Sequence, residues 1–95
     1  MVHSQSKRAV RERYSSLMSR SDLVEIVFEA VTALGGKASV AQVAKYIWDN
    51  YSSELQGSKI LYTWQYDMRW AALKLRKAGQ FKSVSECDRG AWEIA

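Results

Sequence analysis

The chain has 95 residues, of which 47% are hydrophobic and 25% charged, a composition typical of one small globular domain. No apolar run approaches the length of about 18 residues that indicates a membrane-spanning helix, and no apolar segment typical of a secretory signal follows the basic N-terminus. A single cysteine, Cys87, and a single histidine, His3, exclude an internal disulfide and a tetrahedral zinc site built from this chain alone. We therefore expect an intracellular protein, cytoplasmic or nucleoid-associated, that has no membrane partner, metal or other cofactor.

Positive charge is concentrated in two blocks of the sequence. The net charge of +4 divides into +4 for residues 1–20, −3 for residues 21–58, +5 for residues 59–82 and −2 for residues 83–95. Two basic blocks around an acidic one favour an anionic partner such as nucleic acid. The simpler alternative is an ordinary solvated surface.

The first 20 residues form either a basic arm or a short helix. Apolar residues recur at helical spacing between Val10 and Met18, which fits a helix from about Lys7 to Met18. A flexible arm fits the same residues equally well. In both cases four cations are candidates for contacts with a DNA backbone: Lys7, Arg8, Arg11 and Arg13.

A first clear helix is predicted to begin at Ser21 or Asp22. Asp22 and Glu25 have the spacing of a capping box. Apolar residues then follow on one face: Leu23, Val24, Val27, Phe28, Val31 and Leu34. The pair Gly35-Gly36 ends this helix, because glycine adopts the left-handed conformation at a helix C-terminus without steric cost.

A second helix is predicted from Ser39 to about Tyr51. Ser39 and Gln42 form an S-x-x-Q capping box. The apolar stripe consists of Val40, Val43, Ala44, Ile47, Trp48 and Tyr51. The polar stretch Ser52–Ser58 contains a glycine and is predicted to be a loop. Lys37-Ala38, before this helix, is too short to predict as a strand by itself.

A third helix is predicted from Leu61 or Tyr62 to Ala78, with Gly79 as its stop. Its apolar stripe is Trp64, Met68, Ala71, Leu75 and Ala78. Gln65, Arg69 and Arg76 fall on the opposite side. The three cations of the last turns, Lys74, Arg76 and Lys77, are expected mainly to complement the helix dipole.

The C-terminal segment has the pattern of a β-hairpin. Gln80–Ser85 and Ala91–Ile94 are β-prone, and the polar turn between them contains Gly90. Trp92 and Ile94 would share the face that packs on the helices. The fold class predicted is therefore mainly α with a small β-hairpin: a winged helix-turn-helix domain over residues 21–95, with three helices and a C-terminal wing.

Several of these residues resemble a known family. Trp70-Ala71, Leu75–Gly79 and Gly90–Ile94, together with Leu34-Gly35-Gly36, are similar to the N-terminal winged-helix domain of Mrr-type restriction proteins. The family's arginine three residues before the tryptophan corresponds to Asp67 here, and the basic residue is Arg69 instead. The resemblance implies a DNA-binding recognition or regulatory module of a restriction or defence system, with modified bases among its potential targets.

The third helix is the expected recognition helix. In a helix-turn-helix protein the N-terminal half of this helix contacts base edges, where glutamine can pair with adenine and arginine with guanine. The candidate DNA-binding residues there are Lys59, Tyr62, Thr63, Gln65, Tyr66 and Arg69, with Arg89 at the tip of the hairpin. As alternatives, the two tyrosines are core or rim aromatics, Arg69 is a solvated cation and Arg89 an ordinary turn residue.

The four tryptophans separate two functional hypotheses. We expect Trp48, Trp64, Trp70 and Trp92 to lie in the core. If an aromatic stripe is instead exposed, a protein-protein or dimerisation surface becomes the alternative to DNA binding. The sequence contains no P-loop, no dinucleotide fingerprint and no H-E-x-x-H motif, so we do not expect an enzyme.

Overall fold

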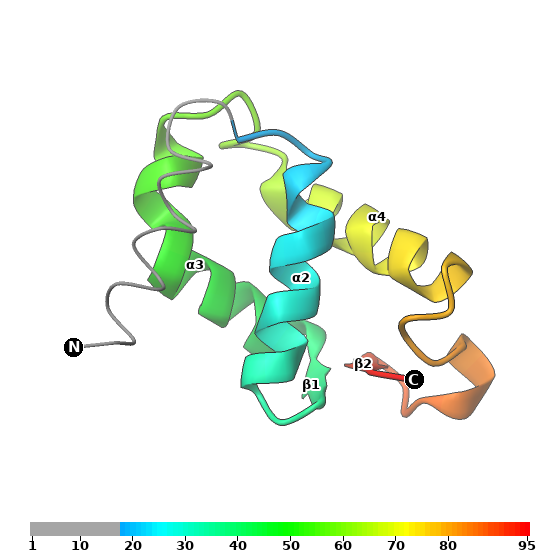
Figure 1. Ribbon diagram of the computed structural model, residues 1–95. Helices are drawn as coiled ribbons and strands as arrows, with labels where there is room; N and C mark the ends of the chain where they lie inside the picture. The colour runs from blue at the N-terminus through cyan, green and yellow to red at the C-terminus, as the bar shows by residue number, and fades with distance from the viewer. Residues whose placement is uncertain (1–17) are drawn as a thin grey trace.

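The computed structural model describes residues 18–95, which are mainly helical with a small antiparallel sheet (Figure 1). The elements in chain order are α2 (Asp22–Ala33), β1 (Lys37–Ser39), α3 (Val40–Gln56), α4 (Trp64–Lys77), the 3-10 helix η1 (Val84–Glu86) and β2 (Ala91–Glu93). The predicted class, three helices with a small β component, is confirmed at this level. The predicted N-terminal helix or arm lies outside the described residues, as do Lys7, Arg8, Arg11 and Arg13. Within residues 18–95, no helix is both long and apolar enough to cross a membrane.

The start of α2 is stabilised one turn earlier than predicted. The Asp22 carboxylate accepts a hydrogen bond from the backbone N–H of Ser19 at 2.9 Å, while the Asp22 N–H donates to the Ser19 carbonyl at 3.1 Å. Asp22 therefore closes a turn that begins at Ser19, and the predicted box with Glu25 is wrong. The end of α2 is as predicted, because Gly35 and Gly36 have φ of 99° and 96°.

The capping box of α3 is confirmed, but the helix is longer than predicted. Ser39 accepts from the Gln42 N–H, and the Gln42 side chain accepts from the Ser39 N–H. The helix passes through a kink at Tyr51 (φ −131°, ψ 16°) and ends at Gln56. The predicted loop is therefore wrong for residues 52–56. The helix continues there because Leu55 is fully buried and extends the core-facing stripe beyond the kink.

The helix α4 begins at Trp64, two to three residues later than predicted, after a series of turns that buries Ile60. Four members of the predicted stripe are buried: Trp64, Met68, Ala71 and Leu75. The fifth, Ala78, is exposed, because the helix has ended and the chain reverses at Gly79 (φ 78°). Arg76 does more than complement the helix dipole, since its guanidinium donates to the carbonyls of Lys82 and Ala91.

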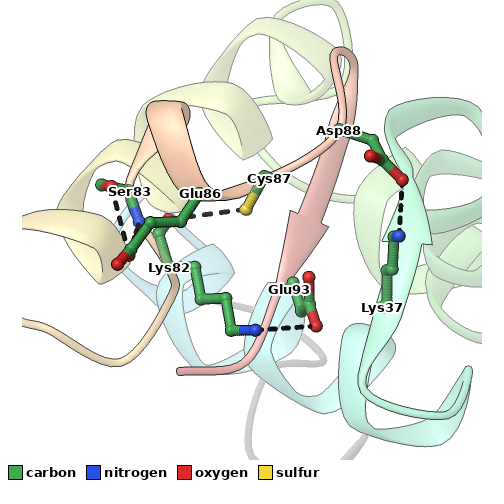
Figure 2. A network of polar contacts seen from close by, with 7 residues as sticks. All are labelled: Lys37, Lys82, Ser83, Glu86, Cys87, Asp88 and Glu93. Atoms are coloured by element: carbon green, nitrogen blue, oxygen red, sulfur yellow. Dashed lines mark hydrogen bonds and ion pairs between the residues drawn. The ribbon is translucent and has the colours of Figure 1, made fainter.

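The β structure differs from the predicted hairpin in its extent. Phe81 and Ile94 form one antiparallel bridge, whereas the longer pairing joins β2 to β1, with Ala38 opposite Trp92. The predicted strand Gln80–Ser85 is wrong beyond residue 82. Ser83 and Glu86 instead form a reciprocal cap that winds residues 84–86 into η1 (Figure 2).

The core joins all three helices to the C-terminal strand. Trp92 is 5% exposed, so the prediction that it lies in the core is confirmed, and it belongs to the same buried cluster as Val27 and Val31 of α2. Phe81 stacks on Phe28 with ring centroids 6.1 Å apart. The C-terminal segment is thus fixed to the side of α2 and α4, which leaves one face of α4 uncovered.

Candidate nucleic-acid interface

The uncovered face of α4 carries polar, aromatic and basic side chains. Its exposed residues are Gln65, Tyr66, Arg69, Leu73, Lys74 and Lys77. They project away from Trp64, Met68 and Leu75 because the opposite side of a helix recurs every three to four residues. Tyr66 is 73% exposed, and Tyr62, in the turn before the helix, is 93% exposed. The alternative that these tyrosines belong to the core is therefore wrong.

Asp67 does not bring negative charge to this face. Its side chain is buried and accepts a hydrogen bond of 2.7 Å from the hydroxyl of Thr63, the N-cap residue of α4. Thr63 is exposed, but its hydroxyl hydrogen is directed to Asp67. Asp67, the only acidic residue of α4, thus stabilises the first turn, and all charged side chains on the exposed face are cations.

The exposed cations of α4 lack the carboxylate partners that three lysines elsewhere in the described chain have. Lys37 pairs with Asp88, Lys45 with Asp49 and Lys82 with Glu93. In the part of the chain that the structure describes, no such carboxylate partner occurs for Arg69, Lys74 or Lys77, or for the exposed Lys59 that precedes the helix. Their charge is available to an external anion.

An aromatic groove adjoins the first turn of α4. It has a volume of about 490 Å³ and is lined by Ala44, Lys45, Trp48, Leu61, Tyr62, Trp64 and Gln65. Trp48 is 39% exposed, so the expectation that it lies in the core is wrong. It stacks on Trp64 instead, with an interplanar angle of 11° and centroids 6.0 Å apart. The sequence does contain the two tryptophans of this groove, but helical periodicity assigns both of them to the interior and so does not predict a groove.

Two cations lie over the half-buried indole of Trp70. Arg20 Cζ is 4.2 Å and Lys74 Nζ is 5.3 Å from the ring centroid. Both distances are within the range of about 6 Å for cation–π attraction. Arg20 precedes α2, so this contact joins the start of α2 to the middle of α4. The sequence pattern did not indicate this contact.

The loop that leads into β2 is ordered by ion pairs (Figure 2). Asp88, in this loop, accepts a hydrogen bond from Lys37 and lies next to its charge. These two interactions hold the pKa of the Asp88 carboxyl below its ordinary value and raise the pKa of Lys37. The Cys87 thiol donates to the Lys82 carbonyl. Arg89, next to this ion pair, is exposed at the turn.

The structure brings most of the predicted site residues together at the start of α4. These are Lys59, Tyr62, Thr63, Gln65, Tyr66 and Arg69, within or just before the first two turns of the helix. Arg89 belongs to the separate turn before β2. Within residues 18–95 no group of three or more His, Cys, Asp or Glu side chains could hold a metal ion. Comparison with known protein families, curated proteins and solved structures finds no match.

Proposed function

We propose that the chain is a winged-helix module that binds double-stranded DNA without catalysing a reaction on it, with α4 as the recognition helix. The observation that carries this proposal is the exposed face of α4. It combines Gln65 and Arg69 with unpaired cations, while Asp67 is buried. The order of elements supports the same proposal, since a strand-paired C-terminal segment follows three packed helices.

The side chains of this face suit two separate tasks. Gln65 and Arg69 are one turn apart and can present an amide and a guanidinium to adjacent base edges in a major groove. Lys59, Lys77 and Arg89 are better suited to phosphates, which fix position without reading sequence. Lys7, Arg8, Arg11 and Arg13 would add phosphate contacts from the N-terminal arm.

The biological setting follows from the resemblance to Mrr-type proteins. A recognition module of a restriction or defence system must distinguish foreign or modified DNA from the cell's own. We therefore propose that the target is defined by base modification as well as by sequence. Parallel binding to methylated and unmethylated duplexes of one sequence tests this part.

Salt dependence of binding tests the central proposal. Affinity for a fluorescent duplex, measured by anisotropy, should fall steeply as salt rises, with a log–log slope of about −0.9 for each phosphate contacted. Replacing the exposed Tyr66 by alanine should weaken binding without altering the melting temperature. A flat salt response, or binding that Tyr66→Ala and Arg69→Ala both leave intact, would contradict α4 as a DNA-binding helix.

The exposed aromatic side chains favour one second candidate, a protein-interaction or dimerisation winged helix. Trp48 and Tyr62 line the aromatic groove, and Tyr66 and Leu73 are exposed on α4. A complex built on these side chains would persist at high salt. Sedimentation of the chain alone at low and high salt separates the two functions, because a salt-resistant dimer that Tyr66→Ala dissolves supports the second.

A further inference from the structure

The cation pair at Trp70 is a feature that neither sequence pattern nor base reading explains. Arg20 and Lys74 lie 4.2 and 5.3 Å from one ring centroid, so their charged groups are at most 9.5 Å apart, the sum of the two distances. The Debye length at 0.1 M salt is about 10 Å, so the repulsion between them is only partly screened. The two side chains therefore concentrate positive charge at one place on the surface.

The indole ring offsets part of the repulsion, and no carboxylate does so in the described chain. Arg20 and Lys74 are both exposed, and neither forms an ion pair within residues 18–95. Asp22 is near Arg20 in sequence, but its carboxylate accepts from Ser19. The two cations are thus held against one ring, and neither has an ion-pair partner among residues 18–95.

We propose that Arg20 and Lys74, held by Trp70, form a binding site for a phosphodiester group on the flank of α4. This inference rests on the proposed DNA-binding function and assigns one of its phosphate contacts. A phosphate bound between two cations removes their mutual repulsion, and a fixed pair loses less side-chain entropy on binding than two free chains. Trp70 is a positioning residue here, since it acts through the cations.

The double variant R20A/K74A tests the two cations on a duplex of random sequence. One phosphate contact contributes about 0.9 to the log–log salt slope, so the loss of affinity between about 50 and 200 mM salt should shrink by about 3.5-fold. Lys45→Ala is the matched control. This variant removes one cation that already pairs with Asp49, and it should flatten the slope by less than R20A/K74A does. An unaltered slope in the double variant would overturn the inference.

Two variants of Trp70 test the positioning role. Trp70→Leu removes the aromatic face and should flatten the slope as the double variant does, whereas Trp70→Phe keeps a ring and should restore most of it. Because Trp70 packs against the core, the melting temperature of each variant must be measured. If Trp70→Leu is folded and retains the full slope, Trp70 does not position the cations.

Nuclear magnetic resonance separates this inference from the proposed function. The NMR resonance of the Trp70 indole N–H should change its chemical shift on titration with the duplex, and this change should be absent in R20A/K74A. If Arg69→Ala weakens duplex binding while R20A/K74A does not, the assignment of a phosphate site to Arg20 and Lys74 is wrong and the DNA-binding proposal stands. A shift with inorganic phosphate but none with duplex would show an anion site that DNA does not use, which overturns the assignment. Absence of any duplex binding by the unaltered chain would overturn both.

Discussion

The hydroxyl of Tyr51 donates a 2.6 Å hydrogen bond to Glu29 across the interface of α2 and α3. Tyr51 is the residue at which α3 departs from helical φ and ψ, and it is 2% exposed. The second oxygen of the same carboxylate accepts from Tyr46 at 2.6 Å. One carboxylate therefore joins the kink, and the turn of α3 before it, to α2.

Tyr51→Phe should lower the free energy of unfolding by about 1–3 kcal/mol. The variant removes a hydrogen bond to a charged group and leaves part of a partly buried carboxylate without its donor. Urea denaturation of the purified chain measures the effect. Tyr62→Phe is the matched control, since Tyr62 is 93% exposed and its variant should stay within about 0.5 kcal/mol of the unaltered chain. Equal stability of both variants would show that the bond to Glu29 contributes nothing.

Alkaline pH should weaken the same interface. Partial burial, and then the hydrogen bond to Glu29, raise the pKa of Tyr46 well above its ordinary value. The folded chain therefore keeps a proton that the unfolded chain releases near pH 10. The stabilisation is complete below about pH 10 and is lost as the pH rises toward the pKa of the folded state.

Denaturation between about pH 8 and pH 11 measures this effect. The contribution of Tyr46 should be constant up to about pH 10, and above about pH 10 the stability of the unaltered chain should fall more steeply than that of Tyr46→Phe, which has no hydroxyl to titrate. Parallel curves for the two proteins would exclude Tyr46 as a source of the pH dependence.

Trp92→Ala should cost about 3–5 kcal/mol of stability, as for other buried aromatic residues. Trp92 is 5% exposed and lies opposite Ala38 in the sheet, so its loss opens a cavity where β2 meets the helices. Trp48→Ala should cost less, because Trp48 is 39% exposed and contributes mainly its stacking on Trp64. If thermal or urea denaturation showed a larger loss of stability for Trp48→Ala than for Trp92→Ala, the assignment of Trp92 to the core and Trp48 to the surface would be contradicted.

Local signals were sufficient where the interaction itself is local. Ser39 and Gln42, the partners of the capping box, are three positions apart, and both are visible in the sequence. The buried stripe of α4 followed from periodicity for the same reason. The exposed positions of Gln65 and Arg69 are the complement of that stripe, so this part of the candidate site was predictable.

Other features depend on partners distant in the chain. Three residues of β1 form a strand only because β2 pairs with them from more than 50 positions away. Trp48 lies at the edge of the apolar stripe of α3, and periodicity cannot tell that the other elements cover Ile47 and Tyr51 but leave this edge exposed. The contact of Arg20 with Trp70 likewise joins segments that only the packing of α2 on α4 brings together.

Truncation should separate the contribution of the basic N-terminal residues from that of the core. Met18 is 3% exposed and Ser19 begins the turn that Asp22 closes, so removal of residues 1–19 should cost about 2–5 kcal/mol more than removal of residues 1–17. Both truncations delete Lys7, Arg8, Arg11 and Arg13. If these contact phosphates, both should weaken binding to every duplex alike and flatten the salt slope by up to about 0.9 per contact. A full slope in the shorter truncation would leave the arm without a role in binding.

Sequence reading by α4 is tested by the contrast between Arg69 and Lys74. Arg69 shares the exposed face with Gln65, one turn away, and the burial of Asp67 leaves that face without a competing acid. If Arg69 contacts a guanine, Arg69→Ala should cost about 1–3 kcal/mol on a preferred site and less on random DNA. Lys74 lies beside Trp70, so Lys74→Ala should weaken preferred and random duplexes by the same factor. Anisotropy titrations on both duplexes give the two ratios directly. Equal ratios for the two variants would remove base reading from α4 and leave it as a helix that binds only the DNA backbone.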